Sequence, residues 1–152
     1  MSLFDSMKVN LFSEMKGVVT LDGKPVSGAL LKRTAIPNND KEYTDNTTTD
    51  ENGRFHFNKM ETKMFSKFLP GESRVHQKVV IDYNGKQYIA WETAAASDVD
   101  KGELNENADI GTSREIEINL KCELTADKTD KAGAYTTVIS GICSWDGQKI
   151  LD

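Results

Sequence analysis

Strict alternation of apolar and polar residues is the feature that most limits what this chain can fold into. It is clearest between Arg114 and Leu124, where every second residue is apolar: Ile116, Ile118, Leu120, Cys122 and Leu124. Successive side chains of a β-strand point to opposite faces, so a period of two predicts a strand with one face in the core and the other in water. The runs Arg54–Asn58 and Val75–Tyr83 have the same period.

Turn residues separate these runs at short intervals along the chain. Asn84-Gly85, the strongest short hairpin signal, lies between two apolar runs, and Asp22–Pro25 and Asp50–Gly53 interrupt others. Helical spacing is confined to Met60–Phe68 and Ala94–Glu103. We therefore predict an all-β, antiparallel sandwich of seven to nine strands with little helix.

The length and the apolar pattern predict one domain without a membrane span. A chain of 152 residues suits a single core. We expect residues 14–152 to form the sandwich and residues 1–13 to be an N-terminal extension. No apolar run reaches the ~18–20 residues that a membrane helix needs. Residues 1–5 lack the basic and apolar regions of a signal peptide, so we expect a cytoplasmic protein.

The charge of the chain is negative and unevenly distributed. The formal net charge is −5 at pH 7. Residues 1–91 contain 13 Lys and Arg against 11 Asp and Glu, whereas residues 92–152 contain 6 against 13. Nucleic-acid binding depends on cationic contacts to phosphate, so this balance argues against a nucleic-acid partner. The acidic second part of the chain could instead steer a basic protein.

Three segments resemble a known family of β-sandwich domains. Gly17–Ala29, with the turn Asp22-Gly23-Lys24-Pro25, looks like the opening of a carboxypeptidase regulatory-like (transthyretin-like) domain. Thr47–Phe57 resembles that family's second signature, a Thr-Asp-x-x-Gly turn before an aromatic strand, and Leu69-Pro70-Gly71 resembles a loop that often follows. The resemblance covers residues 14–72 and implies an immunoglobulin/transthyretin-like β-sandwich, without any functional residues.

The whole chain also resembles a group of small bacterial single-domain proteins of this type, which open with Leu-Phe-Ser. Here those residues are Leu11, Phe12 and Ser13. The resemblance implies a free-standing bacterial module in the cytosol, in some cases connected with contact-dependent secretion loci. It carries over context and no site residues.

The motifs contain no catalytic constellation. His56 and His76 lie on the polar parity of their runs, without the convergent partners that a triad or a metal site needs. Asp98-Val99-Asp100 begins like a calcium loop, but Gly102 and Asp109 stand where an EF-hand needs a ligand and a Glu. Phosphate-binding glycine loops, the GxSxG elbow and the C-terminal Tyr-Arg-Gly-Ser signature of hydroxyisourate hydrolases are missing. We therefore expect a protein that is not an enzyme and that has no cofactor and no metal.

Cys122 and Cys143 leave two interpretations open. Cys122 lies on the apolar parity of its run, and Cys143 lies in the apolar run Ile139–Trp145. If the two strands pair, the cysteines approach the ~4.4–6.8 Å separation of α-carbons that a disulfide requires. The expected cytosolic location favours reduced, buried thiols instead.

Two segments are candidate partner-binding surfaces. Met60–Pro70 combines apolar and basic side chains, which either plug one end of the sandwich or anchor a partner with lysines at the rim. The acidic segment 98–109 would speed association with a basic partner. The candidate residues are Met64, Phe65, Lys67, Phe68, Asp98, Asp100, Glu103 and Glu106.

The lack of catalytic motifs in a free-standing module favours non-catalytic protein binding. In the bacterial context that the resemblance implies, the partner would be a secreted toxin or effector, and the protein an immunity or adaptor protein. Carbohydrate binding is the first alternative, with Trp91, Tyr88 or Trp145 as a stacking platform. A small hydrolase is the second, which replacement of His56 and His76 by Ala would test once an activity was found.

Overall fold

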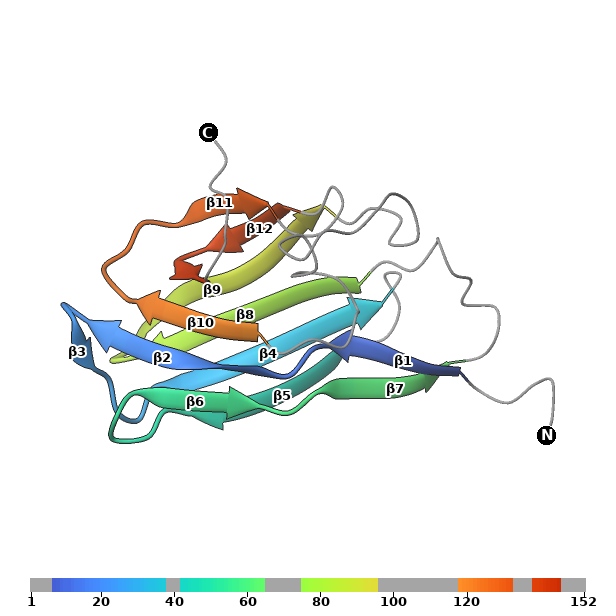
Figure 1. The fold of residues 1–152 in the computed structure, drawn as a ribbon, viewed down its shortest axis with the longest axis horizontal. Coiled ribbons are helices and arrows are strands. Elements are labelled where there is room, and N and C mark those ends of the chain that lie inside the picture. The colour runs from blue at the N-terminus through green and yellow to red at the C-terminus, as the bar shows by residue number, and fades with distance from the viewer. Residues whose placement is uncertain (1–6, 38–41, 65–74, 96–117, 133–137, 146–152) are drawn as a thin grey trace.

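The computed structural model describes residues 7–37, 42–64, 75–95, 118–132 and 138–145. These residues form thirteen strands and no helix, so none of them contributes a helix able to cross a membrane. The strands build two facing β-sheets and a short ribbon, which confirms the expected all-β sandwich (Figure 1). They are β1 (Met7–Phe12), β2 (Met15–Leu21), β3 (Lys24–Pro25), β4 (Leu30–Pro37), β5 (Tyr43–Thr48), β6 (Arg54–Phe57), β7 (Met60–Met64), β8 (Val75–Tyr83), β9 (Lys86–Ala95), β10 (Ile118–Glu123), β11 (Thr129–Ala132), β12 (Val138–Gly141) and β13 (Cys143–Ser144).

The two sheets differ in strand direction. The six-stranded sheet has the order β11-β12-β9-β8-β4-β5, and its neighbours are all antiparallel. The five-stranded sheet has the order β13-β10-β2-β3, with β6 paired to the first part of β2. Among the described strands, only β2 and β10 run parallel, with Met15 opposite Ile118 and Thr20 opposite Glu123. The ribbon of β1 and β7 continues from β2 and β6 (Figure 1).

The thirteen strands exceed the upper expected number of nine by four, because β3 and β13 are short strands that pair over only two residues each, and because β1 and β7 form in segments expected to be an extension and a helical turn. The prediction of a helical turn at Met60–Phe68 is wrong for the first part of that segment, because Met60–Met64 forms the strand β7. β7 instead pairs with β1, which provides hydrogen-bond partners for the backbone groups along one edge of β7. Ala94 and Ala95, expected in a second helical turn, end β9. The remainder of both segments lies outside the described residues.

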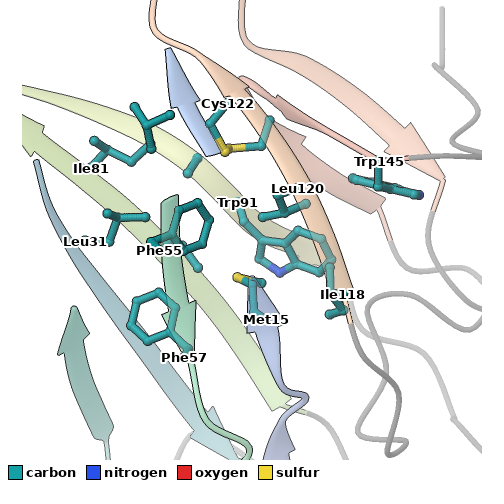
Figure 2. Packing of buried hydrophobic residues seen from close by; sticks show 14 of the residues in the cluster. Met15, Leu31, Phe55, Phe57, Ile81, Trp91, Ile118, Leu120, Cys122 and Trp145 are labelled. Carbon is teal, nitrogen blue, oxygen red and sulfur yellow. A yellow bond between two sulfur atoms is a disulfide. The ribbon is translucent and has the colours of Figure 1, made fainter. Parts of the chain in front are cut away.

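Apolar side chains of both sheets meet in one core (Figure 2). Trp91 from β9 is completely buried, and its ring centroid lies 6.3 Å from that of Phe12 and 5.4 Å from that of Trp145. The alternation expected after residue 117 is present, with these side chains buried: Ile118, Leu120, Cys122 and Leu124. The period of two therefore identified the core face of β10.

Residues assigned to an N-terminal extension are part of this core. Leu11 and Phe12 are completely buried. Gln77 Nε2 donates a hydrogen bond to the carbonyl of Leu11 at 3.0 Å, and Gln77 Oε1 accepts one from Trp91 Nε1 at 3.3 Å. Apolar packing and a buried amide therefore hold β1 against the six-stranded sheet.

Arg33 of β4 is completely buried as well. Its guanidinium lies between two aromatic rings, with Cζ 4.7 Å from the ring centroid of Phe12 and 4.6 Å from that of Phe57. Nε donates to Asp45 Oδ1 at 3.0 Å and Nη2 to Asp45 Oδ2 at 2.8 Å. A buried charge is stable only when it is paired and hydrogen-bonded, and this bidentate pair meets that requirement.

Arg33 also fixes the two junctions between the five-stranded sheet and the ribbon. Nη1 donates to the carbonyl of Ser13 at 2.9 Å, between β1 and β2. Nη2 donates to the carbonyl of Asn58, between β6 and β7. One side chain of the opposite sheet therefore holds both points at which the chain passes from sheet to ribbon.

Glu123, at the end of β10, holds the β2–β3 hairpin. Its carboxylate accepts hydrogen bonds from the N–H groups of Gly23 at 2.8 Å and Asp22 at 3.0 Å, and from the Thr20 hydroxyl at 3.0 Å. It also accepts from the N–H and hydroxyl of Thr125, at 3.0 and 2.7 Å. The hydrogen bonds from Thr125, Gly23 and Asp22 lower the pKa of Glu123 from 4.5 to about 2. The bonds from Thr125 contribute most, and those from Gly23 and Asp22 contribute less.

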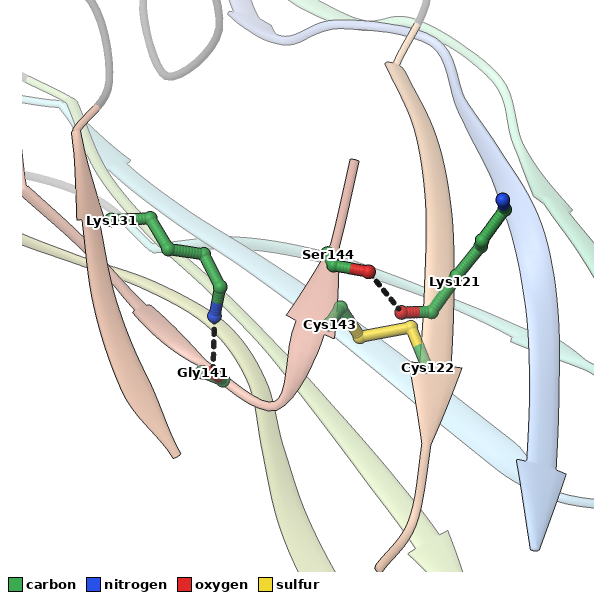
Figure 3. The surroundings of a disulfide bond; sticks show 6 residues. All are labelled: Lys121, Cys122, Lys131, Gly141, Cys143 and Ser144. Atoms are coloured by element: carbon green, nitrogen blue, oxygen red, sulfur yellow. Dashed lines mark hydrogen bonds between the residues drawn. A yellow bond between two sulfur atoms is a disulfide. The ribbon is translucent and has the colours of Figure 1, made fainter. Parts of the chain in front are cut away.

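A disulfide joins the short edge strand β13 to β10 (Figure 3). Cys122 and Cys143 are directly opposite in the antiparallel pair, with α-carbons 4.2 Å apart. The expected approach of the two cysteines is confirmed, whereas the expectation of reduced thiols is wrong for this structure. The bond fixes β13, whose next residue, Trp145, packs on Trp91.

The chain crosses between the two sheets just before this disulfide. Ile142 donates its N–H to the carbonyl of Ile89 at 3.0 Å, in the six-stranded sheet. A Cβ at Gly141 would lie 2.1 Å from the carbonyl oxygen of Ala90, so the crossing requires glycine. Lys131 Nζ donates to the Gly141 carbonyl at 2.7 Å, and burial lowers the pKa of this lysine (Figure 3).

Replacing Arg33 by Lys should destabilise the fold. Lysine keeps the charge but loses the planar stacking and at least one of the four hydrogen bonds, so we expect the free energy of unfolding to fall by about 2–4 kcal/mol. Urea denaturation followed by tryptophan fluorescence measures this change. The control is Arg54→Lys, at an exposed arginine, with an expected change within about 0.5 kcal/mol. Equal stability of both variants would contradict the role of Arg33.

The lowered pKa of Glu123 makes its contribution depend on pH. The ionised carboxylate stabilises the fold above the unfolded pKa of 4.5, and this contribution is lost as the pH falls towards about 2. The wild type should be more stable than Glu123→Gln at neutral pH, and the difference should shrink through that range. Urea denaturation at a series of pH values measures it. A difference that stays constant down to pH 2 would contradict the assignment.

The disulfide should contribute measurably to stability. It joins residues 21 positions apart, so the double variant Cys122→Ser/Cys143→Ser should lose about 2–4 kcal/mol of the free energy of unfolding. Intact mass spectrometry without reductant should find the wild type lighter than the reduced chain by two hydrogens. A wild type with the full reduced mass would show that the bond does not form.

Candidate functional site

A groove of about 760 Å³ crosses the outer face of the five-stranded sheet. Its walls come from β6, β2 and β10, with the end of β5 at one side and Trp145 at the other. Trp145 is only 6% exposed, and the disulfide at the preceding strand holds it in place. The groove is therefore built from strands whose opposite faces pack in the core.

Strand register sets two rows of outward-facing side chains in this groove. Val18 of β2 lies opposite Arg54 of β6 and Lys121 of β10. In the second row, Lys16 of β2 lies opposite His56 of β6 and Asn119 of β10. Outward orientation follows from the period of two, because Met15 and Val19 on the other parity of β2 are completely buried.

The groove is positively charged although the chain is negative. Three cations, Lys16, Arg54 and Lys121, are among the described residues that line it, against the single carboxylate of Asp50. Asp50 Oδ1 accepts the backbone N–H groups of Asn52 and Arg54, each at 2.9 Å, and so belongs to the turn before β6. With neutral His56, the lining carries a formal charge of +2, in a chain of net charge −5.

His56 pairs with a carboxylate at one end of the second row. Its Nε2 lies 2.7 Å from Glu14 Oε2, and both side chains are about half exposed. The residues opposite His56 across the row are Lys16 and Asn119, which bring neither a hydroxyl nor a thiol to this pair. The pair therefore offers charge and hydrogen bonding to a ligand.

The second histidine lies on the other outer face of the sandwich. His76 of β8 is exposed, with Nε2 3.8 Å from Glu92 Oε2, and Lys78 Nζ lies 3.9 Å from the same oxygen. Both histidines thus point outward, as their parity predicts. Within the part of the chain that the structure describes, no three His, Cys, Asp or Glu residues are grouped as a metal site requires.

The aromatic residues considered for carbohydrate stacking lie mainly in the core. Trp91 is completely buried and Trp145 nearly so. Tyr88 is partly buried, and Lys86 Nζ lies 5.1 Å from its ring centroid. Neither tryptophan presents a ring face to solvent on which a sugar could stack.

The partner-binding residues expected from the sequence cannot be placed on this surface. Met64 ends β7, but its side chain lies outside the described residues. The same holds for the whole of Phe65, Lys67, Phe68, Asp98, Asp100, Glu103 and Glu106. These assignments stay predictions.

Sequence reasoning did not find the groove. The alternation identified outward-facing residues such as His56, Asn119 and Lys121 one strand at a time. It contained no sign that β2 and β10 are neighbours, because they lie about a hundred residues apart and pair in parallel through backbone groups. A charge count over outward positions of all predicted strands would have been the available signal.

One comparison with known proteins finds a match. No curated protein and no solved structure matches the chain. A family model matches residues 15–127, which is more than half of the chain and includes both rows of the groove. The match ends before Cys143 and Trp145. The chain therefore belongs to the family described as a domain of unknown function, DUF6795.

Proposed function

We propose that this protein is a non-catalytic protein-binding module whose partner docks in the groove on the five-stranded sheet. The observation that carries the proposal is the pair of side-chain rows held in register around a cavity of about 760 Å³. β2 is hydrogen-bonded on both edges and packs on the core, so the floor of the groove needs no ordering when a partner binds. A preorganised surface lowers the cost of association.

The side chains in the groove support recognition rather than bond-making chemistry. Lys16, Arg54, Lys121 and Asn119 offer charge and hydrogen-bond donors to a ligand, and Val18 adds an apolar contact between them. Donors spread over three strands suit a partner that covers an area of sheet. Catalysis would instead require these donors to converge on one reacting group of a substrate.

A more specific form of the proposal makes the partner a secreted toxin or effector and this protein a bacterial immunity or adaptor protein. Its support is the resemblance of the whole chain, including Leu11-Phe12-Ser13, to small bacterial proteins. The expected cytoplasmic location is part of the same proposal. A cytoplasmic location would favour reduced cysteines, whereas the Cys122–Cys143 bond is typical of an oxidising compartment.

Site-specific photo-crosslinking tests protein binding at the groove. A photoreactive amino acid replaces Asn119, and in a matched control it replaces Asn46, which is exposed on the outer face of the other sheet. After irradiation in a lysate of the source cells, we expect a protein adduct at position 119 that is absent at position 46. Mass spectrometry identifies both the protein and the segment that is attached. Adducts of equal yield at the two positions, or none at 119, would refute the proposal.

A further inference from the structure

We infer that the groove binds an extended acidic segment of the partner protein, which lies across the strands. The segment has two carboxylates, one on each side of an apolar residue. This inference rests on the proposed function and specifies the chemistry of its ligand. It follows from the order of side chains along the first row, in which Arg54 and Lys121 flank Val18.

The spacing of this row sets the spacing of the charges that it can bind. Arg54 and Lys121 lie on either side of β2, so two strand separations, about 10 Å, lie between their α-carbons. An extended or polyproline-type segment advances ~3.1–3.3 Å per residue, so about three positions span that distance. A carboxylate at each end reaches one cation, and an apolar side chain between them contacts Val18.

The second row adds a central cation and, at one end, a carboxylate that disfavours further negative charge in the ligand. Lys16 stands next to Val18 along the face of β2 and contributes a third positive charge, and Asn119 offers an amide to a carbonyl of the ligand backbone. At the other end of this row, Glu14 is bound to His56 and repels a further carboxylate. The acidic residues of the ligand are therefore directed to the cations of the first row.

The length of the groove sets the length of the segment. It runs from the end of β5, across β6, β2 and β10, to Trp145. From β6 to β13, the strand before Trp145, the strands are hydrogen-bonded neighbours, and these three strand separations correspond to about 14 Å, which is about four residues of extended chain. The segment is short enough to be a loop or a terminus of a folded partner.

The charge of the whole protein favours an acidic protein segment over a nucleic acid. A net charge of −5 repels a polyanion at long range, and three cations are few for a ligand whose affinity depends on many phosphate contacts. The aromatic residues among those that line the groove, Phe55 and Trp145, are both buried and offer no ring face for a base.

A library of random eight-residue peptides, displayed on phage and selected on the full-length protein, tests the inference. Clones that also bind the support without the protein are removed. We expect the remaining clones to carry Asp or Glu about three positions apart with an apolar residue between them. Enrichment of neutral or basic sequences would overturn the inference.

Charge reversal on the two outer faces provides the matched comparison. For a selected peptide, Arg54→Glu/Lys121→Glu should weaken binding at least about tenfold, and added salt should weaken wild-type binding as well. The control, Lys32→Glu/Lys78→Glu, makes the same change in net charge on the six-stranded sheet and should weaken binding by less than about threefold. Circular dichroism melting confirms that both variants are folded. Equal weakening by both variants would overturn the inference.

The photo-crosslinking experiment distinguishes the inference from the proposed function. A protein attached at position 119 through a segment without acidic residues would overturn the inference and leave protein binding intact. Absence of any protein adduct would refute the proposed function itself. Tighter binding of a sulfated glycan or a single-stranded oligonucleotide than of every selected peptide would also overturn the inference.

Discussion

The buried guanidinium of Arg33 is the interaction on which the arrangement of this sandwich most depends. A charge removed from water destabilises a fold unless its hydrogen bonds are restored, and here Asp45 and the carbonyls of Ser13 and Asn58 restore them. These partners lie on separate parts of the chain, so they must all be in place together. Arg33 thereby couples the register of the six-stranded sheet to the two junctions of the other sheet with the ribbon.

This coupling matters for the groove because β2 begins directly after the junction at Ser13 and β6 ends directly before the junction at Asn58. The inward residues of both strands are held by the core, which leaves the opposite parity at fixed positions on the outer face. Arg54, Lys16 and Lys121 then form a positively charged area on a protein whose net charge is negative. Such local concentration of charge is what distinguishes this face from the mixed charges around His76, Lys78 and Glu92 on the other.

The far end of the groove depends on different chemistry. β13 pairs with β10 over two residues, and the disulfide between Cys122 and Cys143 adds the covalent link that fixes this edge. The crossing at Gly141 brings β13 from one sheet to the other and places Trp145 on Trp91. The family match covers the cationic rows and Cys122 and ends before Cys143 and Trp145.

The sequence by itself determined the class of the fold and the inward or outward orientation of residues within each strand. The alternation in residues 118–124 correctly separated buried from exposed positions, because the period of two is a property of a single strand. Only the tertiary structure decided which strands are neighbours, that Arg33 is buried on a core face, and that β7 is a strand where helical spacing suggested a turn. Strand pairing is made by backbone groups that every residue carries, so local side-chain patterns do not specify it over a hundred residues. The groove is a product of that pairing, and for this reason it emerged from the structure and not from the pattern.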